Sequence, residues 1–161
     1  MIVVILILNT FTTWFMTGVI WFVQIVHYPL FSLVGVYKFQ DYANAHCSST
    51  GMVVAAPMVI EALTSLILPL LWKRPGLGLL WLNFALLIGI WICTAAFSIP
   101  SHERLCSNGY CEKTQQWLVL TNWARTILWT ARSAINMIII ARNLICWNYS
   151  AKTVITVRDF H

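Results

Sequence analysis

Four long apolar stretches dominate this sequence, at about residues 2–36, 42–72, 76–99 and 114–147. Each reaches the roughly 20 residues that an α-helix needs to cross the hydrocarbon core of a bilayer. A soluble domain would need a charged shell, yet only 9% of the 161 residues are charged and 60% are hydrophobic. The pattern therefore predicts an all-α protein, an antiparallel four-helix transmembrane bundle formed by residues 1–147 as a single domain.

The segments around these stretches predict where the helices end. The first stretch has no basic leader and no small-residue cleavage motif, which favours an uncleaved span over a signal peptide. Tyr28-Pro29 predicts a kink in it. Loops are expected at residues 37–40, 73–76 and 102–113, and Pro100 is expected to end the third span. The polar tail, residues 148–161, contains β-branched residues and predicts either a short strand or a loose end.

The distribution of basic residues predicts the orientation in the membrane, because cytoplasmic loops are enriched in lysine and arginine. One side would carry Lys73, Arg74, Arg142, Lys152 and Arg158. The other would carry Lys38, Arg104 and Lys113. Both termini are therefore predicted to be cytoplasmic. No basic patch with interleaved aromatic residues is present, which argues against binding of nucleic acid.

Polar side chains recur along one face of the fourth stretch. At about 100° per residue, the following side chains form a single stripe: Asn122, Arg125, Trp129, Arg132 and Asn136. An arginine at bilayer depth costs roughly 2.5–3.5 kcal/mol on insertion scales, so this face must meet a partner or water. The interior of the bundle is therefore expected to be polar.

Glu61 in the second stretch lies at a depth comparable to Arg125 and Arg132, and can pair with one of them. Two interpretations are open: a salt bridge that fixes how two helices dock, or a substrate or proton site. The arginine left over could hold a carboxylate, a phosphate or a quinone-like oxygen. In the functional interpretation Glu61, Arg125 and Arg132 are the candidate catalytic residues, and Gln24, Asn122 and Trp129 bind the ligand.

Three histidines are predicted to lie near one side of the membrane: His27, His46 and His102. Neutral imidazoles from different helices can bind a metal ion, and two can ligate a haem. No pair of histidines has metal-ligand spacing on a single helix, however. Histidines near an interface are also commonly only hydrogen-bonded, so both interpretations stay open, with a metal ion or haem as the candidate cofactor.

Two cysteines flank an Asn-Gly turn signal in the predicted loop 102–113. Cys106 and Cys111 would lie outside the cytoplasm, where a disulfide can persist. The short separation suits a closed loop, with two free thiols as the alternative. No Gly-rich phosphate loop and no nucleophile-elbow motif occurs in the chain.

Pieces of all four stretches resemble a family of uncharacterised small four-span bacterial integral membrane proteins: residues 21–31 and 122–132, Pro57 with Glu61, and residues 99–105. More distantly, the architecture is similar to the anthrone-oxygenase-like membrane proteins. The resemblance implies a bacterial inner membrane. It also implies one shared site made by Gln24, His27, Glu61, His102, Asn122, Arg125 and Arg132.

Three functions are compatible with these features. The first is a pocket inside the bundle that binds a metal, a cofactor or a small lipophilic or anionic ligand, with redox chemistry as one option. The second is a non-catalytic subunit or assembly factor of a larger membrane complex, or a homo-oligomer. The third is a small transporter, which the lack of an internal repeat disfavours.

Overall fold

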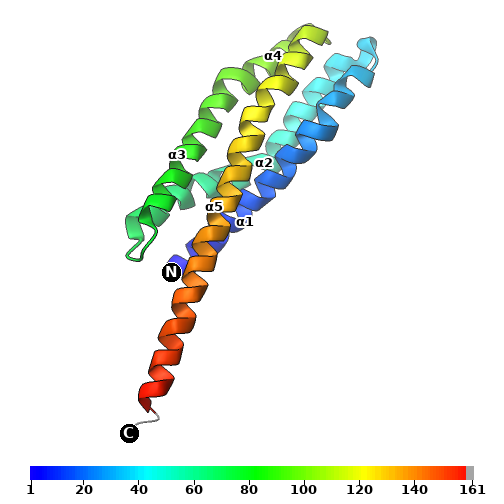
Figure 1. Cartoon of the computed structure of the whole chain (residues 1–161). Coiled ribbons are helices and arrows are strands. Elements are labelled where there is room, and N and C mark those ends of the chain that lie inside the picture. The colour runs from blue at the N-terminus through cyan, green and yellow to red at the C-terminus, as the bar shows by residue number, and fades with distance from the viewer. Residues whose placement is uncertain (159–161) are drawn as a thin grey trace.

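The computed structural model describes the backbone of residues 1–158 and the side chains of residues 1–143. In this part of the chain every element is helical and no strand occurs. Helices α1 (Ile2–Phe22), η1 (Val23–His27) and η2 (Pro29–Leu33) are followed by α2 (Val36–Leu71). Helices α3 (Leu77–Cys93), η3 (Thr94–Ser98), α4 (Ile99–Asn108) and α5 (Glu112–Arg158) complete the chain. Figure 1 shows these elements as long rods lying side by side.

Three of the described rods are long and apolar enough to cross a membrane: Ile2–Leu33, Val36–Leu71 and Leu77–Asn108. The predicted all-helical fold and three of the four predicted spans are therefore supported. Helix α5, the predicted fourth span, is not among them. Its polar stripe lowers the mean hydropathy of the segment, as does Arg142 near the end of that span.

Two predicted loops are wrong, because the chain there stays helical. Helix α2 begins at Val36, so residues 37–40 belong to its first turns. Helix α4 runs to Asn108, so most of the predicted loop 102–113 is helical too. Pro100 directly follows the π-helical segment η3 within the continuous rod Leu77–Asn108, and the local π geometry accommodates a proline inside a helix. It therefore permits the helix that it was expected to end.

Over residues 148–158 the predicted strand or loose end is also replaced by helix. Helix α5 continues to Arg158, beyond the end of the predicted fourth span. Residues 159–161 lie outside the described part of the chain. Figure 1 shows α5 extending well past the other helices at its C-terminal end.

Two short π-helical segments interrupt the regular helices. In η1 the backbone N–H of Tyr28 donates to the carbonyl oxygen of Val23 at 3.0 Å, five residues back. The 3-10 segment η2 then starts at Pro29, so the helix changes geometry where the sequence predicts a kink. The second π-helical segment, η3, precedes Pro100. Such segments are often found at functional sites, and these two carry His27 and Ser98.

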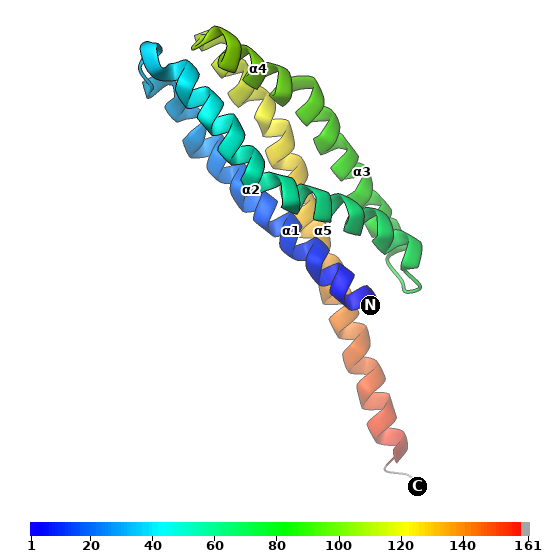
Figure 2. The ribbon, with the colours of Figure 1, turned by 180° about the vertical axis from the view of Figure 1, so that it is seen from behind.

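Helix α2 bends in the middle of its length, as Figure 2 shows. Pro57 lies inside this helix. A proline in a helix interior removes one backbone hydrogen bond and clashes with the preceding turn, so it kinks the helix. The helix packs against α1, α3 and α4 along its length.

In the view of Figure 1 the bundle has an upper end and a lower end. At the upper end the turn at residues 34–35 lies beside the turn at residues 109–111. There Gln40 Nε2 donates to the carbonyl oxygen of Ser107 at 3.1 Å, and the rings of Phe39 and Tyr110 are 5.1 Å apart. The lower end holds the N-terminus and the turn at residues 72–76, where Arg74 Nη1 donates to Asn143 Oδ1 at 3.2 Å.

Candidate functional site

A buried ion pair joins α2 to α5 in the lower half of the bundle. Arg132 Nη1 lies 2.6 Å from Glu61 Oε1, and both side chains are 0% exposed. The remaining groups of Arg132 are also engaged, with Nη2 donating to Ser65 Oγ at 2.8 Å and Nε to Asn83 Oδ1 at 2.7 Å. The second carboxylate oxygen accepts the indole N–H of Trp129 at 3.2 Å. Neither charge is left without a partner.

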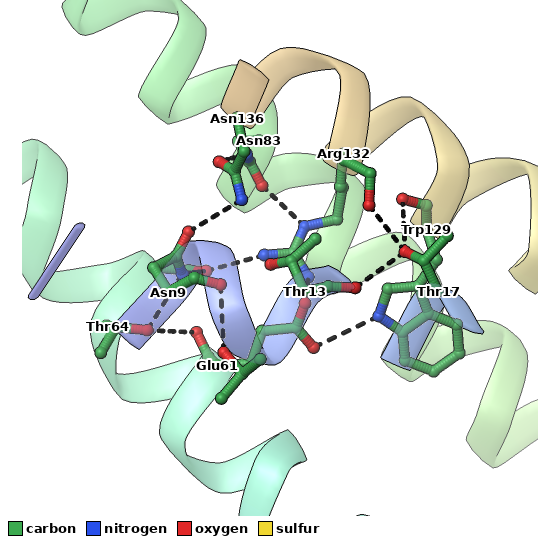
Figure 3. A network of polar contacts seen from close by, with 12 residues as sticks. Asn9, Thr13, Thr17, Glu61, Thr64, Asn83, Trp129, Arg132 and Asn136 are labelled. Carbon is green, nitrogen blue, oxygen red and sulfur yellow. Dashed lines mark hydrogen bonds and ion pairs between the residues drawn. The ribbon is translucent and has the colours of Figure 1, made fainter. Parts of the chain in front are cut away.

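Asparagines extend this ion pair into a network that reaches three helices besides α5 (Figure 3). Asn83 Nδ2 donates to Asn136 Oδ1 at 2.7 Å, and Asn136 Nδ2 donates to Asn9 Oδ1 at 3.3 Å. Asn9 Nδ2 donates in turn to Thr64 Oγ1 and Ser65 Oγ, at 3.0 and 2.8 Å. We call this set the Glu61–Arg132 network: Asn9, Glu61, Thr64, Ser65, Asn83, Trp129, Arg132 and Asn136.

Arg125 lies about two helical turns before Arg132 on the same face of α5 and has different surroundings. Its Nη1 donates to Ser98 Oγ at 2.8 Å and to Asn122 Oδ1 at 3.2 Å. Its guanidinium carbon lies 5.4 Å from the ring centre of Trp129, a cation–π arrangement. Among the described side chains no carboxylate pairs with Arg125, and its Nε has no hydrogen-bond partner.

The burial of Arg125 makes this lack of a counter-charge significant. The residue is only 9% exposed. A buried charge is costly unless it is paired, and the described part of the bundle supplies only neutral dipoles and an aromatic face. The surplus arginine expected from the sequence is therefore Arg125. The side chain that pairs with Glu61 is Arg132.

The three predicted histidines do come together, between η1, α2 and α4. His27 Nε2 lies 2.8 Å from His46 Nδ1, and the ring centres of His46 and His102 are 5.2 Å apart. His102 Nε2 lies 2.9 Å from the hydroxyl of Tyr28. Thr50 Oγ1 is a second partner of His46 Nδ1, at 3.1 Å. Hydrogen bonds therefore join His27 to His46 and His102 to Tyr28, and the rings of these two pairs pack together.

The predicted metal site is not supported. Within residues 1–143 no group of three His, Cys, Asp or Glu side chains is arranged to hold a metal ion. A metal–nitrogen bond is about 2 Å long, and ligand nitrogens converge on one point. Here His27 and His46 direct their nitrogens at each other. The same contact leaves no room for an iron between these two rings, so the predicted haem ligation by this pair is not supported either.

Arg125 lies near Tyr28 and His102. Its guanidinium lies beside the Tyr28 phenol, which is buried. We call the following set the histidine cluster: His27, Tyr28, His46, His102 and Arg125. Tyr28 was missed as a site residue by the sequence analysis, although it directly follows His27 at the predicted kink.

The predicted ligand-binding residues support Arg125 and the helices around it. Asn122 Nδ2 donates to Gln24 Oε1 at 2.8 Å, and Gln24 Nε2 donates to the carbonyl oxygen of Val119 at 3.1 Å. Both side chains are therefore satisfied inside the protein. Trp129 is fully buried and contacts both the Glu61–Arg132 network and Arg125. Its indole N–H donates to Glu61, and its ring face packs against the guanidinium of Arg125.

A groove of about 620 Å³ runs between the α1–η1 segment and α2. Its walls are mostly apolar, and the polar side chains gather around the histidines. His27 and His46 of the histidine cluster line it directly. The other lining residues are Gly18, Val19, Phe22, Val23, Tyr42, Ala45, Ser49, Thr50, Val53 and Val54. An apolar groove with a few convergent polar groups is the usual form of a small-molecule site.

The predicted disulfide between Cys106 and Cys111 is not present, and all four cysteines in the described part are free thiols. Because α4 continues to Asn108, Cys106 sits on a helix that packs against α2. The chain then turns at Gly109, which has a φ of 78°, and leaves Cys111 exposed. The sulfur nearest to Cys106 belongs to Cys47, at 3.1 Å.

Comparisons of this chain with protein-family models, with curated proteins and with solved structures gave no match. The resemblance to small four-span bacterial membrane proteins therefore stays a prediction.

Proposed function

We propose that this chain is an antiparallel four-helix membrane protein whose α1–α2 groove binds a lipophilic molecule with an acidic or carbonyl-bearing head group. The observation that carries the proposal is the buried Arg125. It lacks a carboxylate partner among the described side chains and lies near Tyr28 and His102, which pack against His46 in the wall of the groove.

The inside-out polarity of the helices supports the membrane part of the proposal. Large apolar side chains are exposed along every rod, while polar side chains in the middle of the rods, such as Glu61, Asn83 and Arg132, are buried. Helix α5 follows the same rule, since Ile127 is 62% exposed and Arg132 is 0% exposed. We therefore include α5 as the fourth span. Its moderate hydropathy comes from the inward face, and lipid would contact the apolar outer face.

The orientation and the membrane are part of the same proposal. Lys73 and Arg74 lie at the lower end with Arg142, followed on α5 by Lys152 and Arg158, and Lys38, Arg104 and Lys113 belong to the upper end. The positive-inside rule then favours a cytoplasmic lower end. A bacterial inner membrane agrees with the sequence resemblance.

The head group of the ligand would lie at His27 and His46, and its apolar body along the groove. Arg125 supplies a fixed positive charge behind the histidines, in a region from which water is largely excluded. Electrostatic attraction is much stronger there than in water, so an anionic or strongly polarised oxygen is favoured. The imidazoles and the Tyr28 hydroxyl can donate to such an oxygen or exchange a proton with it.

The Glu61–Arg132 network has a different role in this proposal. Its charges neutralise each other, and its amides hold α1, α2, α3 and α5 in register. Glu61 and Arg132, two of the three predicted catalytic residues, are therefore structural here. Gln24, Asn122 and Trp129 hold Arg125 in place and do not contact the ligand.

Binding of a long-chain fatty acid tests this proposal. Purified protein in mild detergent is titrated with oleate and with its methyl ester, and tryptophan fluorescence reports binding. Wild-type protein should bind oleate. In Arg125→Gln the fixed positive charge behind the histidines is lost, and the Kd for oleate should rise by roughly 10-fold, about 1.4 kcal/mol. Ile127→Ala, a change on the outer face of the same helix, is the matched control and should bind normally. Equal binding by wild type and Arg125→Gln would contradict the proposal.

One observation favours a second function, a subunit of a larger membrane complex. Helix α5 spans Glu112–Arg158 and extends past the other helices of the bundle (Figure 1). At 1.5 Å per residue such an extension can reach a neighbouring protein. If this function is correct, a stoichiometric partner should copurify from native membranes, and truncation of the chain after Asn143 should release it.

A further inference from the structure

Two cysteine thiols meet across the interface of α2 and α4. Cys47 Sγ and Cys106 Sγ are 3.1 Å apart, although the residues are 59 positions apart in the chain. Both side chains are half-buried. The tertiary fold, and not a short loop, therefore brings this pair together.

The contact is close to what a disulfide requires. The sulfur atoms of a disulfide are about 2.05 Å apart, so these two need to approach by roughly 1 Å. Small rotations about the side-chain bonds produce displacements of this size. Cys111 is exposed beyond the turn at Gly109, and the thiol of Cys106 already faces Cys47.

We propose that Cys47 and Cys106 form a reversible redox pair, which closes to a disulfide on exchange with a small-molecule disulfide. One thiol, as the thiolate, attacks the reagent RSSR, forms a mixed disulfide and releases RS⁻. The second thiolate attacks the protein sulfur of this mixed disulfide and releases the second RS⁻. Two electrons pass from the protein to the reagent, and the two thiol protons pass to the two RS⁻ groups.

The position of the pair gives the disulfide a structural consequence. Cys47 directly follows His46 in α2, and Cys106 lies one helical turn after His102 in α4. A bond between the sulfurs would tie the two helices together beside the two histidines. Oxidation would hold His46 and His102 at their present separation, and reduction would leave α2 and α4 held together by packing and hydrogen bonds alone.

The test uses 4,4′-dithiodipyridine, a small apolar disulfide that releases a coloured thiopyridone at each exchange step. The full-length protein carries Cys93→Ser, Cys111→Ser and Cys146→Ser, so that only Cys47 and Cys106 remain. We expect two thiopyridones per protein and an intact mass that falls by two hydrogens, with no pyridyl group attached. Dithiothreitol should restore both thiols.

The matched control adds Cys106→Ser and leaves Cys47 alone. It should release one thiopyridone and keep one pyridyl adduct, because no second thiol can displace it. Two adducts retained on the two-cysteine protein would overturn the proposal. If the triple substitution impairs folding, peptide mapping of oxidised wild-type protein is used instead. A peptide pair linked between Cys47 and Cys106 is expected, and a pair linked between Cys106 and Cys111 would overturn the proposal. None of these outcomes depends on ligand binding at the groove.

Discussion

Two arginines on the same face of α5 have opposite electrostatic surroundings. Arg132 is fully buried and paired with Glu61 at 2.6 Å. Arg125, about two turns away, is almost as buried but contacts only hydroxyl, amide and aromatic groups in the described part of the chain. The difference shows that burial alone does not identify a functional charge. What distinguishes Arg125 is the missing counter-charge together with its connection to a groove.

Loss of the Glu61 carboxylate should have the largest effect on stability. In Glu61→Gln the guanidinium of Arg132 remains buried without a counter-charge, which typically costs about 3–5 kcal/mol. Thermal unfolding of the variant in detergent measures this cost. Arg125→Gln should unfold close to wild type, because it removes a charge that has no carboxylate partner in the described bundle. Equal destabilisation by the two substitutions would contradict the contrast between the arginines.

A double substitution sharpens the same comparison. In Glu61→Leu with Arg132→Leu both charges are removed, and a well-packed apolar pair often restores much of the stability lost by removing one partner. The double variant should therefore be more stable than either single variant. Its oleate affinity should stay near that of wild type, because the groove and Arg125 are unchanged.

Loss of the Asn136 amide should have an intermediate effect. Asn136 connects Asn83 to Asn9, and truncation to alanine leaves buried polar groups without a partner on both sides. We expect a loss of about 1–3 kcal/mol in the free energy of unfolding. Asn44, an exposed residue bonded only to the carbonyl oxygen of Gln40 in its own helix, provides the control. Asn44→Ala should change stability by about 0.5 kcal/mol or less.

A smaller loss of stability than at Asn136 is expected at Tyr28, in the histidine cluster. Tyr28→Phe removes a hydroxyl that lies 2.9 Å from His102 Nε2 and keeps the ring that packs in the core. The free energy of unfolding should fall by about 1 kcal/mol. Affinity for oleate should also fall, because the connection between Arg125 and the histidines is lost. If Tyr28→Phe binds oleate with wild-type affinity, Tyr28 does not transmit any effect of Arg125 to the groove. That result would contradict the proposed function.

Much of the fold follows from the hydropathy pattern, because long apolar runs leave few alternatives to helices. The polar stripe on α5 also follows from helical periodicity, and so does the burial of its five side chains. Helix boundaries were less predictable. Pro100 is compatible with both a stop and a start, and only the backbone geometry around η3 and α4 decides between them.

The pairing of side chains was the least predictable part of the site. Arg125 and Arg132 lie on the same stripe, so periodicity cannot say which one meets Glu61. That choice depends on how α2 slides along α5 and where α2 bends. Cys106 was assigned to Cys111 because they are close in the sequence, yet the helical continuation to Asn108 turns it toward Cys47. Such contacts depend on tertiary register, which a single sequence does not reveal.

Two matched serines provide the most direct test of the central claim. Ser65 Oγ accepts from Arg132 and Ser98 Oγ accepts from Arg125, both at 2.8 Å, and each residue is 4% exposed. Each is changed to Asp and to Asn, and the unfolding temperature of each Asp variant is compared with that of its Asn counterpart. The charge introduced at Ser98 should raise the unfolding temperature, because it gives Arg125 a counter-charge. The same charge at Ser65 should lower it, because Glu61 already occupies Arg132. If the two sites respond alike, Arg125 does not differ from Arg132 and the proposed anion site is wrong.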